Sequence, residues 1–328
     1  MRKRKLMMIT GILTFVLTGC TVTGCGTTSD RIRVGAAGLG GMYHAFADTF
    51  TDIAQSENEE YKMEVKTTAG SAANLRLLSE NYVQLAIAQA DLTNDAYYGT
   101  GIFEGKEYQG YSAIAGLYTE ACQIVVRDDS DIKSVDDLQG KKISIGEEES
   151  GTEQNANQIL AAYGLTDQLV DKINLDYTEA ASELKDGEID AFFCTAGIQT
   201  TVIGELSKQC EIRLLDLDEK EKDKLMKAYD FYTEYEIPAE TYAGQTEAVD
   251  TVGVKAVLLA NDKMSEKTVE NLTRILFANE KELQYSLSAD ITLDEADAVE
   301  GISVPFHKGA AKYYESAGVD VTTEKGSK

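Results

Sequence analysis

Short apolar runs alternate with segments of helical periodicity from Arg31 onward, which leaves few fold classes open. The alternation is typical of βα units that build a largely parallel sheet. Apolar residues at i, i+3 and i+4 predict amphipathic helices within residues 43–54, 156–163 and 269–276. The predicted strands cover residues 31–34, 63–67, 85–89, 111–115, 123–126, 142–145, 189–193, 212–215 and 252–259. We therefore expect an α/β protein.

The chain is long enough for more than one core. It has 328 residues, of which 43% are hydrophobic, and this supply of apolar side chains can fill two cores. It contains only two Pro and no low-complexity linker or internal repeat. We therefore expect two cores that share one continuous chain.

The N-terminal segment has the pattern of a bacterial lipoprotein signal. Basic residues at positions 2–5 precede an apolar run over residues 6–17, and a Thr-Gly pair precedes Cys20. The run is shorter than the roughly 20 residues that a helix needs to cross a bilayer. We interpret residues 1–19 as a signal peptide and residues 20–30 as a tether. Acyl chains on Cys20 would hold the protein at the outer face of the cytoplasmic membrane.

Alternatives stay open at this terminus. A second copy of the pattern ends at Cys25, so the acylated residue is Cys20 or Cys25. An ordinary secretory signal with a stray cysteine is the other alternative, and it would leave the protein without an anchor. No segment after the signal is apolar enough to span a membrane, so the rest of the chain is expected to be extracytoplasmic and soluble.

Acidic residues dominate the composition. Asp and Glu number 56 against 31 Lys and Arg, which gives a formal net charge of −25. Such a surface repels phosphate backbones and anionic lipid, so nucleic-acid binding is not expected. The same acidity also favours solubility outside the cell.

The cysteines and histidines indicate neither a disulfide framework nor a metal site. Two of the five Cys belong to the copies of the lipoprotein pattern. Cys122 and Cys194 lie in apolar runs typical of small buried thiols, and Cys210 is undecided. With two His and no Cys-rich spacing, no metal or other cofactor is expected.

Loops rich in Gly and short polar residues follow several predicted strands. Residues 35–41 join the first strand to the first helix, where glycines let the backbone approach an anion and expose N–H groups. Residues 67–71 and 89–91 follow later strands, at the rim where α/β sheets bind ligands. These loops are candidates for a carboxylate or phosphate site. A tight turn without a ligand is the alternative, because the spacing is not the GxGxxG of a dinucleotide fold.

The loop at residues 146–153 has the pattern of a helix start. Ser150 and Glu153 have the Ser-x-x-Glu spacing of a capping box. This motif explains both residues without a ligand, yet it leaves the N–H groups of Gly151 and Thr152 available to one.

Nucleophilic catalysis has no support in the sequence. Ser71 and Ser150 have no His or Lys close by in the chain, and His44 and His307 are far from both. A lone His on a helix is more often a surface or core residue than a catalytic base. We therefore expect a protein that is not an enzyme.

With these loops in view, the chain resembles the TAXI family of extracytoplasmic solute receptors, the substrate-binding subunits of one class of TRAP transporters. The resemblance spans residues 32–318. The matching segments are residues 35–43, 70–78, 85–91, 117–120, 135–141, 150–153, 184–193, 252–256 and 307–314.

The resemblance implies a type II periplasmic-binding-protein fold, in which two α/β lobes close over a small solute. Residues 31–119 and 251–328 would form lobe 1 and residues 120–250 lobe 2, with crossings near 119–123 and 249–254. Families of this kind carry amino acids such as glutamate, or dicarboxylates such as 2-oxoglutarate, with a sodium-coupled membrane permease as partner. The ligand-binding residues carried over by position are Ala37, Gly38, Leu39, Tyr43, Ser71, Gln89, Asp91, Ser150, Gly151, Thr152, Thr195, Ala196 and Gly197.

The chain departs from the family in two loops. It has Ala36, Ala37 and Leu39 where hydroxyl residues are common, and acids at residues 147–149 where small residues are usual. Either these acids all face solvent, or at least one meets a cationic group of the solute, such as an amine, and the solute is then an amino acid rather than a plain dicarboxylate. A sensory binding module with the same fold is the alternative function.

Overall fold

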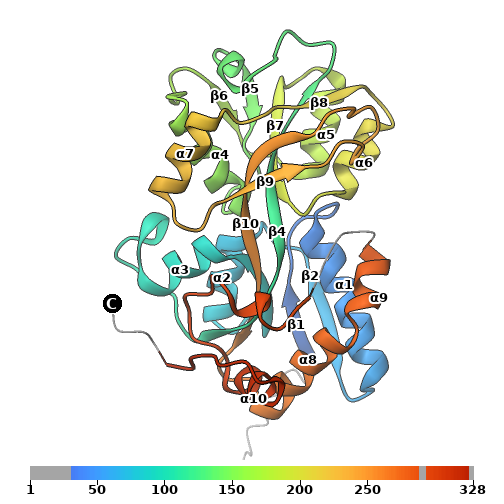
Figure 1. The fold of residues 1–328 in the computed structure, drawn as a ribbon, viewed down its shortest axis with the longest axis vertical. Coiled ribbons are helices and arrows are strands. Elements are labelled where there is room, and N and C mark those ends of the chain that lie inside the picture. The colour runs from blue at the N-terminus through green and yellow to red at the C-terminus, as the bar shows by residue number, and fades with distance from the viewer. Residues whose placement is uncertain (1–30, 288–292, 325–328) are drawn as a thin grey trace, which may run out of the picture. The chain divides into compact units, whose positions relative to one another are not determined.

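Two long strands, β4 (Tyr111–Arg127) and β10 (Val249–Asn261), lie side by side at the centre of the sheet and run through most of its length (Figure 1). The computed structural model describes residues 31–287 and 293–324. The expected signal peptide, the tether, Cys20 and Cys25 lie outside the described residues.

The described strands form one mixed sheet in the order β2-β1-β3-β10-β4-β7-β5-β6, while β8 pairs with β4 and β9 pairs with β10. β10 is antiparallel to β3 and β4, and β4 is antiparallel to β7. The remaining strands are β1 (Arg31–Gly35), β2 (Lys62–Lys66), β3 (Leu85–Gln89), β5 (Lys142–Ser144), β6 (Asp171–Ile173), β7 (Ala191–Ala196), β8 (Ile212–Leu214) and β9 (Thr233–Ile237).

Helices connect the strands and cover the sheet (Figure 1). The α-helices are α1 (Met42–Glu57), α2 (Ser71–Ser79), α3 (Ala90–Tyr98), α4 (Gly151–Ala162), α5 (Tyr177–Asp186), α6 (Thr201–Ser207), α7 (Glu219–Ala228), α8 (Glu266–Ala278), α9 (Glu280–Leu287) and α10 (Lys308–Ala317). Short 3-10 helices lie at Gly101–Phe103, Val135–Leu138 and Asp297–Val299.

Buried apolar side chains divide the sheet into two regions. One cluster draws on residues 34–117 and 256–314, and we call the elements around it the terminal region. Two clusters draw on residues 121–254, and we call the elements around them the middle region. Burying a Leu or Phe side chain contributes about 1.5–3 kcal/mol, so each cluster is a substantial source of stability. The chain passes between the two regions within β4 and β10.

The predicted helices are confirmed, because α1, α4 and α8 contain their apolar stripes. Two predicted strands were confirmed in position, but the break expected between them was wrong. Residues 111–115 and 123–126 belong to one strand, because the polar residues between them continue the extended backbone of β4. The sheet is mixed rather than largely parallel, since β10 inserts antiparallel between β3 and β4.

Cys122 and Cys194 are buried free thiols, as the sequence predicted, and Cys210 is a partly exposed free thiol. Within residues 31–287 and 293–324, no helix is long and apolar enough to cross a bilayer.

Candidate functional site

A cavity of about 40 Å³ lies where loops of the terminal and middle regions meet. One water needs roughly 10–15 Å³ of such space, so in this conformation the cavity holds only a few water-sized groups. It is lined by Ala37, Gly38, Gly41, Met42, Tyr43, Ala69, Gly70, Ser71, Gln89, Glu120, Glu147, Ser150, Gly151, Thr152, Asp176, Tyr177, Thr195 and Ala196.

Five helices begin at the cavity. Their N-cap residues are Gly41 for α1, Gly70 for α2, Gln89 for α3, Ser150 for α4 and Asp176 for α5, and all five line it. A helix N-terminus carries a partial positive charge and N–H groups without partners inside the helix. The backbone therefore gives this cavity an affinity for anionic groups.

The loop before α1 is held by one buried amide. Asn74 is 0% exposed, and its Nδ2 donates to the carbonyl oxygens of Ala36 and, at 2.8 Å, of Ile87. Thr68 Oγ1 also donates to the Ala36 carbonyl, at 3.1 Å. The loop keeps one shape because these carbonyls are satisfied from inside the terminal region.

His44 is bonded locally rather than placed against a nucleophile. Its Nδ1 lies 3.1 Å from the carbonyl oxygen of Ala37, and its Nε2 lies 3.5 Å from Asp48. The side chain thus helps to fix the first loop.

The loop before α4 is held by caps. Ser150 Oγ accepts from the Glu153 N–H at 3.0 Å, as the predicted capping box requires. The return bond differs from the prediction: Glu153 Oε2 accepts from the Glu149 N–H at 2.8 Å, because the Ser150 N–H donates to the carbonyl of Glu147 at 3.0 Å. The turn is therefore one residue wider than a simple capping box.

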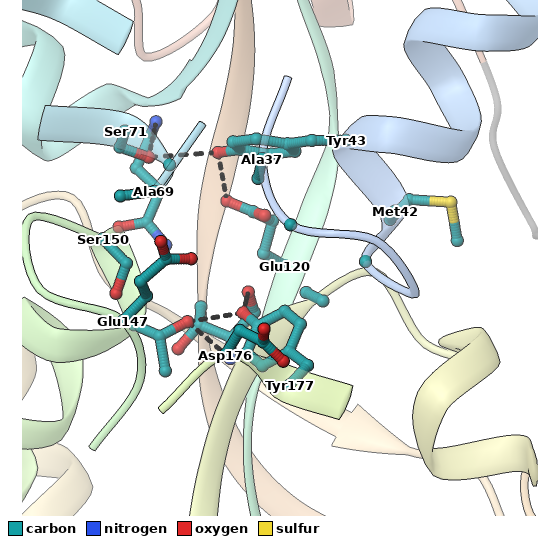
Figure 2. Close-up of a pocket in the computed structure, with 18 residues that line it drawn as sticks. Ala37, Met42, Tyr43, Ala69, Ser71, Glu120, Glu147, Ser150, Asp176 and Tyr177 are labelled. Carbon is teal, nitrogen blue, oxygen red and sulfur yellow. Dashed lines mark hydrogen bonds between the residues drawn. The ribbon is translucent and has the colours of Figure 1, made fainter. Parts of the chain in front are cut away.

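A chain of hydrogen bonds crosses the terminal side of the cavity and ends on Glu120 (Figure 2). The Gln89 N–H donates to Ser71 Oγ at 3.1 Å. Ser71 Oγ lies 3.4 Å from Tyr43 Oη, and the Tyr43 hydroxyl donates to Glu120 Oε2 at 2.9 Å. All these donors point toward the Glu120 carboxyl.

A second network holds the middle side. Thr152 Oγ1 and Tyr177 Oη are 2.6 Å apart, and the Tyr177 hydroxyl donates to the Thr195 carbonyl at 3.0 Å. The Thr195 N–H donates back to Thr152 Oγ1 at 3.2 Å. These bonds join α4, α5 and β7 into one wall.

Acidic side chains define the electrostatics of the cavity. Glu120 is 2% exposed, and burial raises its pKa to about 8 against the opposing effect of hydrogen bonds from Tyr43 and Gln89. Burial, with Asp176 and Glu179 nearby, raises the pKa of Glu147. Glu120 and Glu147 reach into the same space, whereas Met42 points away from it (Figure 2). The described lining has no Lys, Arg or His, so its side chains contribute only negative charge.

The three acids that depart from the family pattern face different surroundings. Glu147 lines the cavity, and Glu148 is exposed. Glu149 forms an ion pair with Arg76 of α2, and its carbonyl accepts from the Ala72 N–H at 3.1 Å. One of the three is therefore placed to meet a solute.

Direct contacts between the two regions close the cavity. Gln89 Nε2 donates to Asn155 Oδ1 of α4 at 2.9 Å. A Cβ built on Gly151 would lie 2.3 Å from Gln89 Oε1, so only glycine allows this approach. The Val202 N–H donates to the Gly40 carbonyl at 3.3 Å on the other side.

The structure brings ten of the thirteen predicted site residues to the cavity; Leu39, Asp91 and Gly197 do not line it. Leu39 is 62% exposed. Gly197 packs beside Met42 and Tyr118. Asp91 caps the first turn of α3, where its carboxylate accepts from the Leu92 N–H at 2.7 Å, and burial raises its pKa to about 7.

Sequence reasoning did not assign Glu120, Asp176 or Tyr177 to the site. The sequence did mark Glu120, because it is an acid between the apolar runs of β4. Burial of an acid is costly unless a partner compensates it. Asp176 and Tyr177 had only the pattern of a helix start. Among the described residues, no group of three or more His, Cys, Asp or Glu is arranged to hold a metal ion.

Solved structures share this architecture. A periplasmic transporter superposes with a TM-score of 0.57 at 13% identity, over 82% of this chain and 90% of that one. A protein from Bordetella bronchiseptica RB50 gives 0.52 at 15% identity, over 91% and 85%. A putative L-cystine ABC transporter from Listeria monocytogenes gives 0.51 at 15%, over 80% and 98%. The fold is that of the type II periplasmic binding proteins, as the sequence predicted.

The sequence itself also matches a family model. The match to the NMT1-like family covers residues 34–318, from the end of β1 past the last helix. It includes every residue that lines the cavity. The chain belongs to the NMT1-like family.

Proposed function

We propose that this protein is the extracytoplasmic solute-binding subunit of a TAXI-type TRAP transporter. The observation that carries the proposal is a cavity lined by both regions, at which five helices begin. Ligand sites in α/β proteins combine such helix N-termini with a few convergent polar groups. The TAXI motifs of the sequence and the family match support the assignment to transport rather than to catalysis.

Binding would close two lobes over the solute. We assign residues 31–119 and 251–328 to one lobe and residues 120–250 to the other, joined through β4 and β10. Hinge closure of this kind needs contacts that form only when the lobes meet. The bond from Gln89 to Asn155 and the bonds to the Glu149 carbonyl have that character.

The solute is a small compound with both a carboxylate and an amine, such as an amino acid. Helix N-termini favour the carboxylate, and Glu120, Glu147 and Asp176 favour the amine. A plain dicarboxylate would meet acids with no cationic side chain among the described lining residues. Its repulsion from one Glu at about 7 Å, with an effective dielectric near 20, is roughly 2 kcal/mol.

Calorimetry and thermal unfolding of the soluble form that starts after Cys25 test this assignment. Glutamine and glutamate are compared with 2-oxoglutarate and succinate. An amine-bearing compound at 100 times its dissociation constant should stabilise the protein by about 2.7 kcal/mol and reduce its radius in small-angle scattering. Tight binding of succinate together with no binding of the amines would contradict the proposed solute class. No binding of any of the four would contradict the proposed site.

The transporter type needs its own experiment. The soluble form is added to membrane vesicles prepared from cells that produce this protein. We expect uptake of the bound solute to depend on a sodium gradient and not on ATP. Uptake driven by ATP would replace the TRAP assignment with another class of transporter.

Lipid anchoring at Cys20 also belongs to this proposal. Acylation of a cysteine behind a signal peptide would hold the protein at the outer face of the membrane, near a permease. Metabolic labelling with palmitate should mark the full-length protein, and Cys20→Ala should remove most of the label. Loss of label only in the double variant with Cys25→Ala would move the anchor, and no label on the wild type would exclude it.

A further inference from the structure

We propose that Glu120 binds the cationic group of the solute, and that this binding releases a proton from Glu120 to the solvent. The inference rests on the proposed function, namely that the cavity takes an amine-bearing solute. It goes further by naming the acceptor for the amine and by predicting a proton that leaves when the solute arrives.

Glu120 has the position that a cation acceptor needs. It lies where β4 passes from one region to the other, opposite Val254 of β10, and its side chain reaches into the cavity (Figure 2). Glu120 is 2% exposed, so bulk water cannot solvate a charge on its side chain. An ionised Glu120 therefore requires a partner inside the cavity.

Gln89 offers a second buried acceptor beside Glu120. Gln89 Oε1 is buried and has no hydrogen-bond partner among the described residues, although Gln89 lines the cavity. Its Nε2 is already used by Asn155. A buried acceptor without a donor costs about 1–3 kcal/mol, and an ammonium group has three N–H donors to offer. One such group can therefore serve Glu120 and Gln89 Oε1 together.

Among the residues that the structure describes, no cation lines the cavity or acts on the charge of Glu120. The titratable groups that act on it electrostatically come from α1, β4, α3, α5 and β7, and Glu147 and Asp176 share its cavity. The interacting groups are Tyr43, Tyr118, Asp91, Tyr177, Cys122 and Cys194. Each of these is neutral or negative, so without a solute the neutral carboxylic acid is the favoured form.

The exchange balances in charge and atoms. In the cavity without solute Glu120 is a carboxylic acid, which accepts one hydrogen bond from the Tyr43 hydroxyl. When the ammonium group enters, the O–H bond of the acid breaks and the proton passes to water or buffer. The carboxylate then pairs with the ammonium, which keeps its own protons. The carboxylate and the ammonium carry opposite charges, so this exchange adds no net charge to the cavity.

The experiment is isothermal titration calorimetry of wild-type protein with L-glutamine at pH 7, in phosphate and in Tris. These buffers differ in ionisation heat, so the difference between the observed heats counts released protons. With a starting pKa of about 8, glutamine should release about 0.9 proton per molecule bound. Between pH 6 and pH 7 the dissociation constant should fall roughly tenfold, because the ionised fraction of Glu120 rises tenfold.

Matched variants assign the proton to Glu120. Glu120→Gln keeps the size of the side chain and an oxygen for Tyr43, and it should abolish both the proton release and the pH dependence. Asp91→Asn removes a partly buried acid whose pKa is also raised toward neutrality, and Glu147→Gln removes a second acid that lines the cavity; both variants should keep the release. Unchanged circular dichroism and unfolding of each variant serve as the control for folding.

The outcomes separate this inference from the proposed function. Binding of glutamine to wild type with equal heats in the two buffers would overturn the inference alone. Proton release that persists in Glu120→Gln but disappears in Asp91→Asn or Glu147→Gln would assign the proton to another acid and overturn it as well. No binding of glutamine, glutamate, 2-oxoglutarate or succinate to wild type would overturn the proposed function and this inference together.

Discussion

The terminal region packs around a single hydrophobic cluster, whereas the middle region packs around two clusters on opposite faces of its sheet. In β7, Phe193 belongs to one middle cluster and its neighbours Phe192 and Cys194 to the other, as the alternation of side chains in a strand requires. Helices α4 and α7 cover the first of these clusters, and α5 and α6 cover the second.

The two regions also bring different chemistry to the cavity. The terminal region contributes aligned hydroxyl and amide groups, namely Tyr43, Ser71 and Gln89, fixed by internal hydrogen bonds. The middle region contributes the acids Glu147 and Asp176 at less buried positions. Glu120 lies in the strand that joins them. The difference teaches that hydrogen bonds in both regions fix the geometry of this site, whereas the acids outside β4 come from the middle region.

Removal of the Asn74 side chain should lower the stability of the protein most, because this amide holds the loop before α1 in the terminal region. Asn74→Ala removes the side-chain donor to the buried Ile87 carbonyl, at about 1–3 kcal/mol, and leaves the Ala36 carbonyl with Thr68 Oγ1 as its remaining side-chain donor. We expect urea unfolding to show a loss of about 3 kcal/mol. Ser150→Ala, which removes the cap of the middle loop, should cost about 1 kcal/mol. Equal losses for both variants would remove the contrast between the two loops.

A methyl group at the contact between the regions should have the next largest effect. Gly151→Ala places a Cβ against Gln89, so the regions cannot meet without a shift of side chains or backbone. Overpacking of this kind costs about 1–3 kcal/mol, equivalent to a dissociation constant for glutamine that is about five- to 150-fold higher. Scattering should show no reduction in radius at moderate ligand concentration.

Gly204→Ala is the control for this variant. A Cβ there meets no atom within 4 Å, so closure and affinity should be unchanged. Normal closure of Gly151→Ala would mean that the close contact with Gln89 is not needed for binding.

Neutralising one acid of the middle region should have the smallest effect. Glu147→Gln removes a charge that faces the cavity and should weaken glutamine binding by about 1–2 kcal/mol at low salt, about five- to thirtyfold. Glu148→Gln makes the same charge change at an exposed position and should alter affinity less than twofold. If the two variants weakened binding equally, and both effects disappeared at high salt, the acids would act only through the overall negative charge of the surface.

Much of the fold follows from periodicity, and its exceptions have physical causes. Helix α1 and strand β3 carry unbroken apolar patterns, because each packs against the main terminal core. Strands β6 and β9 were not predicted, since β6 has only three residues and β9 is largely polar, with Glu234 and Glu236 exposed. The sequence did not predict residues 111–127 as one strand, because polar residues that lie near the site separate its two apolar runs.

The candidate site was predictable to the extent that backbone chemistry marks it. Glycines and short polar residues at strand ends and helix starts brought Gly38, Ser71 and Gly151 to attention, and all three line the cavity. Glu120 and Asp176 were not predicted, because in a chain with 56 acids a single carboxylate carries little information. Only the surrounding burial distinguishes Glu120 from the rest.

The place of β10 in the sheet bears on how the chain folds as it is made. β10 inserts between β3 and β4, yet it lies more than 120 residues after both of them begin. As synthesis proceeds, β3 therefore keeps one edge without its native partner until nearly the whole middle region has emerged. Pairings so distant in sequence form slowly because a long loop must close first. The terminal region can become complete only after the middle region, although β1, β2, β3 and the first part of β4 are made before it.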